Sequence, residues 1–366
     1  MTSEFGKGQG APFDDSAKVG YDGARSTSED GGAQLTMRKL KYLFLRLLSL
    51  DFGNMFAVIG KIHKQTGRPR AIIFLDIAWC GFRYLAGYMD YYIFGMYNLN
   101  ARQRETVLTR GKNDRFIKML NDSKHWHIVD NKDEFNAKFE KYLRRDWFYI
   151  NDNEPSFVQW VSGRSAIIVK PRDGTCGKGI ERIVPSEHKA EDLYRYLVQN
   201  KLTVLEEVVT QHSEMRALHP HSVNTIRVVT VLKHKEPRVV VAFMRIGNGK
   251  VVDNFNSGGM VVPVDVKDGT VKFPAIDKAG NLYRRHPLTN VSIEGFTVPL
   301  WGEVLELAKK AARELPELGI MGWDVAVTDD GPLLIEGHHY PGHDIYQLPP
   351  HTPDGIGLLP LSLIHI

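Results

Sequence analysis

The stretch from Gly322 to Gly342 constrains the fold more than any other part of the chain. Two short apolar runs, 323–327 and 333–337, flank the segment Asp329-Asp330-Gly331. Apolar runs separated by a short Gly-containing segment are typical of a β-hairpin, here with a three-residue turn. The sequence therefore predicts two paired strands that end at residue 337.

This hairpin places two carboxylates opposite each other. With Asp330 at the centre of the turn, Asp324 faces Glu336 on one side of the ribbon. The other side then carries the apolar pairs Val325–Ile335 and Val327–Leu333. Like charges directly opposed on paired strands are destabilising, and a cation reverses the sign. Two carboxylate oxygens at that separation suit Mg²⁺, whereas the alternative is a solvated hairpin edge whose acids face water or an arginine.

Composition excludes several classes of protein. The chain has 366 residues, a net charge of +4 and scattered basic residues, which gives no indication of nucleic-acid binding. Two cysteines, Cys80 and Cys176, lie far apart and indicate neither a disulfide framework nor a zinc cluster. No run reaches the roughly 20 apolar residues of a membrane span, and no signal core begins the chain. We expect a cytoplasmic protein.

The two ends contribute little to the fold. Residues 1–35 are rich in Gly, Ser, Asp and Glu and predict a disordered tail. Residues 361–366 read like a translated sequencing adapter, so 349–366 is interpreted as a truncated or artefactual tail. Residues 37–52 predict a basic, apolar helix that packs on its own protein or, alternatively, lies on an anionic membrane surface as a peripheral contact.

The rest of the chain predicts an α+β protein with a helical front third. The aromatic-rich segment 73–97 is interpreted as core, with a substrate cleft as the alternative. A helical pattern follows over 115–143 and is broken at 130–132. The later elements are predicted strands at 166–170, 203–209, 225–232 and 239–245 and helices at 190–199 and 301–315.

A glycine-rich loop follows the strand that ends at Lys170. Gly174, Gly177 and Gly179 let backbone N–H groups turn toward an anion, and Lys170 and Lys178 add positive charge. The chain then resumes a strand at 180–184, so this is not a Walker loop. The pattern favours a loop that covers phosphates, with a flexible hairpin tip as the alternative.

Two arginines and a second polar loop complete a phosphate-binding pattern. A hairpin turn at 235–237 places Arg227 and Arg245 on the same face, where an anion would relieve their repulsion. The small-residue loop 253–259 is able to close on a polyphosphate. The strand at 203–209 could hold an adenine through its backbone, and a following carboxylate could bind ribose.

In this order the residues resemble the ATP-grasp superfamily. The closer resemblance is to the sugar-transfer-associated ATP-grasp family, over roughly residues 70–345. It rests on the segments Gly87–Tyr91, Asn224–Arg227, Gly322–Asp324 and Ile335–Gly337. The resemblance implies an ATP-grasp fold, with two α+β lobes gripping ATP behind a helical N-terminal region. The expected bounds are 36–125 for that region, 126–205 for the first lobe with its lid, and 206–348 for the second lobe with the metal site.

The resemblance also implies roles for individual residues. Asp324 and Glu336 would bind Mg²⁺, and His338 stands where the superfamily usually has Asn, which makes Mn²⁺ use or a site with two protein ligands plausible. His338, His339 and His343 complete no tetrahedral zinc set. Arg227, Arg245 and Lys178 would act at the transferred phosphate. The residues expected to bind ATP are Lys132, Lys170, Gly174, Thr175, Gly177, Gly179, Glu206, Glu207, Val209, Glu214 and Asn256.

The implied activity is that of a carboxylate–amine ligase working through an acyl phosphate. Its partners would be a small-molecule or glycan-linked carboxylate and an amine, in glycan, capsule or peptide biosynthesis. One alternative is a kinase that phosphorylates a hydroxyl on the same scaffold. The other is a non-catalytic nucleotide-binding partner of a glycan assembly machine, which His338 favours. The sequence does not select the substrates or the oligomeric state.

Overall fold

A computed structural model describes residues 51–151, 153–174, 179–249, 255 and 258–360. Its chain divides into two compact units, 1–76 and 77–366, and the division falls within one helix. The first unit holds α2 (Phe52–Thr66) and the start of α3 (Arg70–Tyr84). Asp51 caps α2 by accepting a hydrogen bond from the backbone of Asn54, and Gly67 ends the helix in the left-handed conformation (φ 71°).

The second unit begins with short helices. These are α4 (Tyr88–Ile93), η1 (Met96–Asn98), α5 (Ala101–Thr106), α6 (Arg110–Leu120), η2 (Ser123–His125), α7 (His127–Asp130) and α8 (Lys132–Leu143). The predicted break at 130–132 is confirmed, because α7 ends at Asp130 and α8 begins at Lys132. No helix in the described part of the chain is long and apolar enough to cross a membrane.

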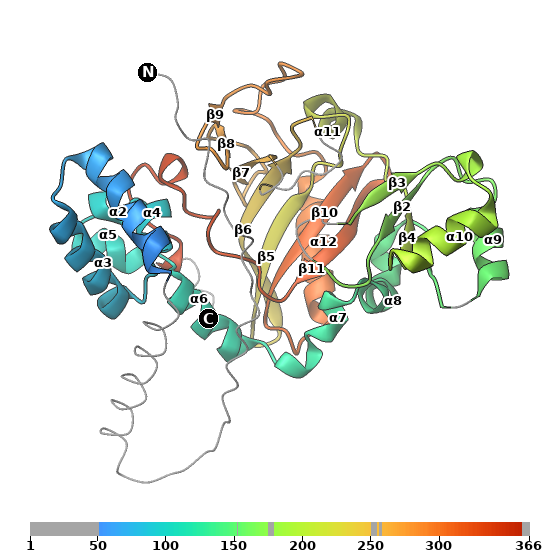
Figure 1. The fold of residues 1–366 in the computed structure, drawn as a ribbon, viewed down its shortest axis with the longest axis horizontal. Coiled ribbons are helices and arrows are strands. Elements are labelled where there is room, and N and C mark those ends of the chain that lie inside the picture. The colour runs from blue at the N-terminus through green and yellow to red at the C-terminus, as the bar shows by residue number, and fades with distance from the viewer. Residues whose placement is uncertain (1–50, 152, 175–178, 250–254, 256–257, 361–366) are drawn as a thin grey trace, which may run out of the picture. The chain divides into compact units, whose positions relative to one another are not determined.

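A four-stranded antiparallel sheet follows, in the order β1-β4-β2-β3. Its elements are β1 (Trp147–Tyr149), α9 (Glu154–Val161), β2 (Ile167–Lys170), β3 (Glu181–Ile183), η3 (Pro185–Glu187), α10 (Ala190–Gln199) and β4 (Val204–Glu207). Phe157 of α9 and Leu197 of α10 are buried with Ile167 and Leu205 of the sheet in one apolar cluster. Figure 1 shows these two helices beside β2, β3 and β4.

A seven-stranded antiparallel sheet forms the larger core, in the order β11-β10-β5-β6-β7-β8-β9. Its elements are α11 (Ser213–Leu218), β5 (Ile226–Lys233), β6 (Glu236–Ile246), β7 (Met260–Val264), β8 (Ala275–Asp277), β9 (Leu282–Tyr283), α12 (Trp301–Glu314), β10 (Ile320–Thr328), β11 (Gly331–His338) and η5 (Pro349–His351). The amphipathic helix α12 buries Val304, Ala308 and Ala311 against β5, β6, β10 and β11. The predicted α+β class with a helical N-terminal part is confirmed.

The acidic hairpin forms, but its register differs from the prediction on one side. Asp324 pairs with Glu336 as expected. Val325 pairs with Leu334 and Val327 with Pro332, so the predicted apolar pairs are wrong. The reason is a β-bulge that leaves Ile335 as an extra residue on β11. The pairs beyond the bulge are shifted by one residue, so Thr328 pairs with Gly331 and the connection between the strands has two residues.

The β5–β6 hairpin turns earlier than predicted. Lys233 pairs with Glu236, so His234 and Lys235 form the two-residue loop and the predicted turn at 235–237 is wrong. Both loop residues have positive φ, 51° and 68°, as a type I′ turn requires. Neither residue is Gly or Asn, so the sequence carried no signal for this turn.

The interpretation of segment 73–97 as core holds for only part of it. Tyr84, Tyr91 and Phe94 are buried, whereas Trp79 and Phe82 are 54% and 66% exposed. Periodicity alone did not distinguish the two groups, because both recur at helical spacing on α3 and its neighbours.

Parts of the chain's ends lie outside the described residues. They include the predicted tail 1–35, nearly all of the predicted helix 37–52, and residues 361–366. Within the interpreted tail 349–366, the amide of Gly357 donates to Thr106 Oγ1 at 2.8 Å, and that of Leu358 donates to Gln347 Oε1 at 3.1 Å.

The buried His219 connects the segment that precedes β5 to the segment that follows β6. His219 is fully buried; its Nε2 accepts a hydrogen bond from the amide of Gly249, and its Nδ1 lies 3.0 Å from Ser222 Oγ. The accepting Nε2 fixes the neutral tautomer with the proton on Nδ1. Burial, with His286 and His221 nearby, lowers the pKa of His219 to about 4.

Candidate nucleotide and metal site

A cleft in the second unit gathers charged residues from both sheets. It is lined by Lys132 at the start of α8, Lys170 of β2, Glu206 of β4, and Glu336 and His338 of β11, together with Gly174. These residues are separated by up to 206 positions in sequence, and the antiparallel pairing of the two sheets brings them to one place. Six residues predicted to bind nucleotide or metal therefore share one cleft.

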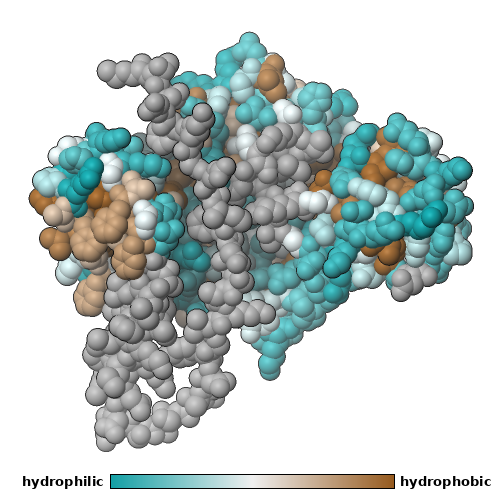
Figure 2. All heavy atoms as spheres, in the orientation of Figure 1, coloured by the Kyte–Doolittle hydropathy of each residue, from teal (hydrophilic) through white to brown (hydrophobic). Residues whose placement is uncertain are grey.

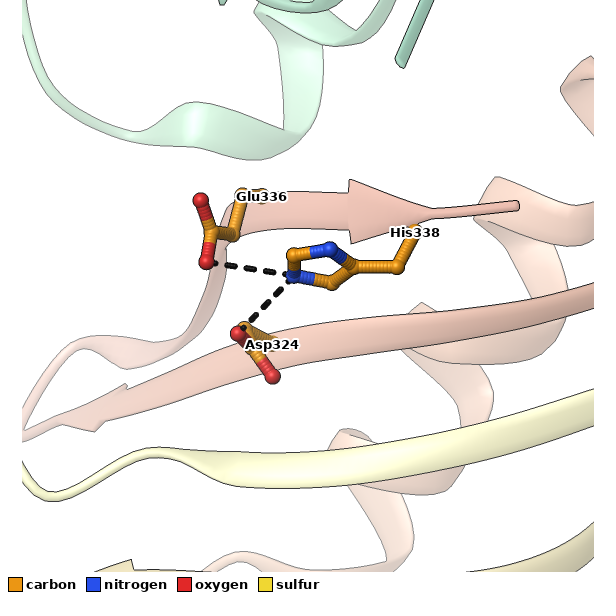
Figure 3. A group of neighbouring side chains, drawn as sticks. All are labelled: Asp324, Glu336 and His338. Atoms are coloured by element: carbon orange, nitrogen blue, oxygen red, sulfur yellow. Dashed lines mark hydrogen bonds and ion pairs between the residues drawn. The ribbon is translucent and has the colours of Figure 1, made fainter. Parts of the chain in front are cut away.

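Three potential metal ligands cluster at the edge formed by β10 and β11. Figure 3 shows the imidazole of His338 pointing toward both carboxylates. Its Nε2 lies 3.1 Å from Glu336 Oε1 and 3.4 Å from Asp324 Oδ2. One donor atom from each residue lies within 4.8 Å of the others, a spacing that a single divalent cation can bridge. His338 and Glu336 share a face because they are two residues apart on one strand.

Asp324 is also held by two arginines. Arg227 donates to both carboxylate oxygens, with Nη2 at 2.8 Å from Oδ2, and Arg245 Nη1 donates to Oδ2 at 2.8 Å. The arginines lie close together as predicted, and the anion between them is Asp324 itself. Burial alone would raise the pKa of Asp324, but the charge of Arg227 and, to a lesser degree, that of Arg245 hold it well below its usual range.

The side chains of Asp324, Glu336 and His338 suit a divalent cation, and they differ in burial and in donor atom. The side chain of Asp324 is 2% exposed, whereas that of Glu336 is 38% exposed and faces the cleft. Burial alone would raise the pKa of Glu336, but His338 outweighs burial and lowers it. Burial and Arg227 alone would lower the pKa of His338, but Glu336 and Asp324 outweigh them and raise it. Glu336 and Asp324 offer the oxygen ligands that Mg²⁺ prefers, and His338 adds a nitrogen better suited to Mn²⁺.

Glu206 holds Lys170 of β2 in a buried network. Its Oε2 accepts from Lys170 Nζ at 2.6 Å and from Arg145 Nε at 3.1 Å, and its Oε1 accepts from Asn136 Nδ2 at 3.1 Å. Burial would raise the pKa of Glu206, but Arg145 and then Lys170 hold it far below its usual value. The side chain of Glu206, predicted as part of an adenine hinge, is thus committed to a buried ion-pair network.

Sequence reasoning missed Arg145. Besides Glu206, it donates to the carbonyl oxygens of Leu334 and Ile335, at the bulge of β11. Arg145 therefore ties the small sheet to the strand that carries Glu336. The adjacent Arg144 and Arg145 read in sequence as ordinary surface charges, and only burial distinguishes the second.

Lys132 is tied to the root of the glycine-rich loop. Its Nζ donates to the carbonyl of Gly174 at 3.0 Å, and its amide donates to that of Arg172 at 2.9 Å. Burial lowers the pKa of Lys132, with Glu336 acting in the opposite direction. Gly174 and Gly179 have φ of 127° and 71°, which other residues rarely adopt.

The remaining predicted site residues do not line this cleft or lie outside the described residues. Glu207 is exposed and near Arg164, Val209 is half-buried, and Glu214 is exposed in the first turn of α11. Thr175, Gly177, Lys178 and Asn256 are outside the described part of the chain.

The segment after β11 is fixed by the helices of the second unit. His339 stacks on Trp126 with ring centres 4.2 Å apart and pairs with Asp130 at 3.1 Å. His343 Nε2 lies 2.9 Å from the buried Asp90. Tyr340 donates to Asp114, which anchors the same segment to α6. These helices hold the segment that follows the candidate metal ligands, a contribution that the sequence did not reveal.

Strands of two antiparallel sheets thus bring paired lysines and a cluster of three potential metal ligands to one cleft. The model of the sugar-transfer-associated ATP-grasp family matches residues 111–353, about two thirds of the chain. The chain belongs to this family. The predicted resemblance to this family and the predicted ATP-grasp fold are confirmed. A search of curated proteins returned no significant match.

Solved structures of ATP-grasp enzymes are similar to this chain at low identity. The ATP-grasp ligase PsnB, complexed with minimal precursor, Mg and ADP, shares 14% identity over 72% of this chain and 68% of that chain, with a TM-score of 0.38. D-alanyl-alanine synthetase A from Vibrio cholerae shares 11% over 64% and 63%, with a TM-score of 0.40. The N5-carboxyaminoimidazole ribonucleotide synthetase purK, an ADP complex, shares 14% over 59% and 46%, with a TM-score of 0.37, so the chain spans less than half of that protein.

Proposed function

We propose that this protein is an ATP-dependent ligase that joins a carboxylate to an amine. The observation that carries the proposal is the cleft that combines Lys132 and Lys170 with the cluster of Asp324, Glu336 and His338. Two lysines facing a divalent-cation site suit the polyphosphate of a nucleotide. Membership of the ATP-grasp family supports the nucleotide as ATP.

Each group in the cleft has a task in this proposal. Lys132 and Lys170 bind the phosphates of ATP, and Glu206 orients Lys170 by accepting a hydrogen bond from its Nζ. Glu336 and Asp324 hold the divalent cation with His338, and that ion supplies neutralisation of phosphate charge when bound. Arg227 and Arg245 face the transferred phosphate from beside Asp324. The protein contributes positioning and charge, as in other phosphoryl transfers.

The proposed reaction runs in two steps. The substrate carboxylate attacks the γ-phosphorus of ATP, and ADP leaves, which gives an acyl phosphate. An amine then attacks the acyl carbon, phosphate leaves, and an amide forms with loss of a proton from the amine. The family description favours a glycan-linked or sugar-derived carboxylate or amine as substrate.

One observation favours a second candidate function. Both oxygens of Asp324 are occupied by arginines, and a metal-binding role requires at least one of these contacts to open. A protein in which they stay closed would bind a nucleotide through its lysines without turning it over. This is the non-catalytic nucleotide-binding partner considered from the sequence.

Nucleotide turnover by the full-length protein tests the proposal. ADP and free phosphate are measured with Mg²⁺ or Mn²⁺ and pooled amino acids, amines and uronic acids. We expect both products only with particular pools, and their loss in Glu336→Gln. Glu191→Gln is the matched control, because Glu191 is exposed on α10 and does not line the cleft. ADP without free phosphate would indicate the kinase, and ATP binding without turnover would indicate the non-catalytic partner.

A further inference from the structure

Helix α3 carries apolar residues on two different faces. Its inner face buries Ile73, Ile77, Cys80 and Tyr84, all at most 7% exposed. Its outer face carries Ile72, Leu75, Trp79 and Phe82, which are 56%, 65%, 54% and 66% exposed. The outer residues recur at intervals of three and four, so they form one stripe along the helix. A surface helix needs one apolar face to pack, and the second face of α3 requires a separate explanation.

Helix α2 adds exposed aromatic residues in the first unit. Phe52 and Phe56 are 47% and 59% exposed, and Phe56 stacks on Phe74 of α3 with ring centres 6.4 Å apart. Figure 2 shows brown spheres gathered over the helices that Figure 1 labels α2 and α3. Contiguous exposed apolar surface of this kind is typical of an interaction site.

Basic residues outnumber acids around these side chains. Five exposed basic residues lie on α2, α3 and their connection; the acids are the exposed cap residue Asp51, the half-buried Asp76 and Glu105, which pairs with Arg83 at 2.7 Å. The basic residues are Lys61, Lys64, Arg68, Arg70 and Arg83. The preceding sequence 37–50 adds four more Lys and Arg residues and no acid. Segment 37–50, or the same helices of a second copy, would therefore bring positive charge against positive charge.

We propose that the outer face of α3, with the exposed aromatics of α2, docks this protein on an anionic lipid bilayer. Trp and Phe side chains are suited to the boundary between headgroups and acyl chains, and surrounding Lys and Arg residues are attracted to anionic headgroups. The helix lies in the plane of the interface and does not span the membrane. This inference concerns α2 and α3 and is independent of the ligase activity.

Vesicle co-sedimentation of the full-length protein tests this inference. Vesicles of phosphatidylcholine alone are compared with vesicles in which about 3 parts in 10 are the anionic lipid phosphatidylglycerol. We expect preferential binding to the anionic vesicles and its weakening by salt, because screening removes the attraction of the basic residues. The variant Leu75→Ser/Trp79→Ser should bind at least about tenfold more weakly, since two large apolar side chains no longer enter the interface.

The matched control is Met119→Ser/Leu288→Ser, which changes two residues that are each 62% exposed elsewhere in the chain. It should bind vesicles like the wild type, and urea midpoints should show that both variants fold. Equal binding by Leu75→Ser/Trp79→Ser and the wild type would overturn the inference, as would absence of binding by the wild type. A dimer in light scattering that this variant converts to monomer would overturn it in favour of an interface between copies.

Discussion

Glu206→Gln is the sharpest test of how Lys170 is held in the cleft. Glu206 is 4% exposed and accepts hydrogen bonds from three donors, on Lys170, Arg145 and Asn136. A glutamine has the same shape, but its NH₂ group would face one of these donors in either orientation. It would also leave two cations buried without a counter-charge. Breaking a buried ion pair in this way costs about 3–5 kcal/mol, a large part of the about 5–15 kcal/mol that stabilises a typical protein.

Urea unfolding of the full-length protein at pH 7 measures this cost. Asp146→Asn is the matched control, because Asp146 makes a similar pair with Arg164 at 2.8 Å but its side chain is 69% exposed. The control should change the free energy of unfolding by about 1 kcal/mol or less. A loss below about 1 kcal/mol for Glu206→Gln, or equal effects of the two variants, would refute a buried, charged network at this position.

Two further predictions concern residues that support the site. In the folded chain the pKa of His219 is lowered to about 4, whereas in the unfolded chain it is near 6.5. Between these two pH values the unfolded chain binds a proton that the folded chain does not. The free energy of unfolding therefore falls as the pH drops from about 6.5 toward 4, by at most about 3 kcal/mol. Urea midpoints measured at pH 7, 6 and 5 should fall with pH in the wild type and in the control His188→Gln, which changes an exposed histidine. The fall should be smaller in His219→Gln. Gly322→Ala should destabilise the protein by about 1–3 kcal/mol and weaken ATP binding, because the new Cβ would lie 2.8 Å from Pro341 Cβ and 3.0 Å from Arg227 Cδ. Gly302→Ala, whose Cβ meets nothing within 4 Å, should not destabilise the protein, because alanine is a better helix former than glycine in α12. Equal effects of the two substitutions in thermal shift with and without ATP would contradict the close packing at Gly322.

Local sequence was sufficient for the elements that carry the site. The opposition of Asp324 and Glu336 followed from strand alternation around a turn, and it held although the turn was two residues long and a bulge shifted the pairs between them. The helices at 190–199 and 301–315 followed from their amphipathic period and agree with α10 and α12. These features depend on residues close in sequence, whose spacing is visible without a tertiary structure.

Tertiary structure decided which charges are paired and which faces are covered. The sequence placed Arg227 beside Arg245, but only the neighbouring strand β10 showed that Asp324 neutralises both. It gave no sign that Arg145 is buried or that Glu206 holds Lys170, because these contacts join residues 36–190 positions apart. It likewise could not separate the buried face of α3 from the exposed one, since both have the same period. Periodicity determines which residues share a face, whereas burial and charge pairing depend on what the rest of the chain brings against that face.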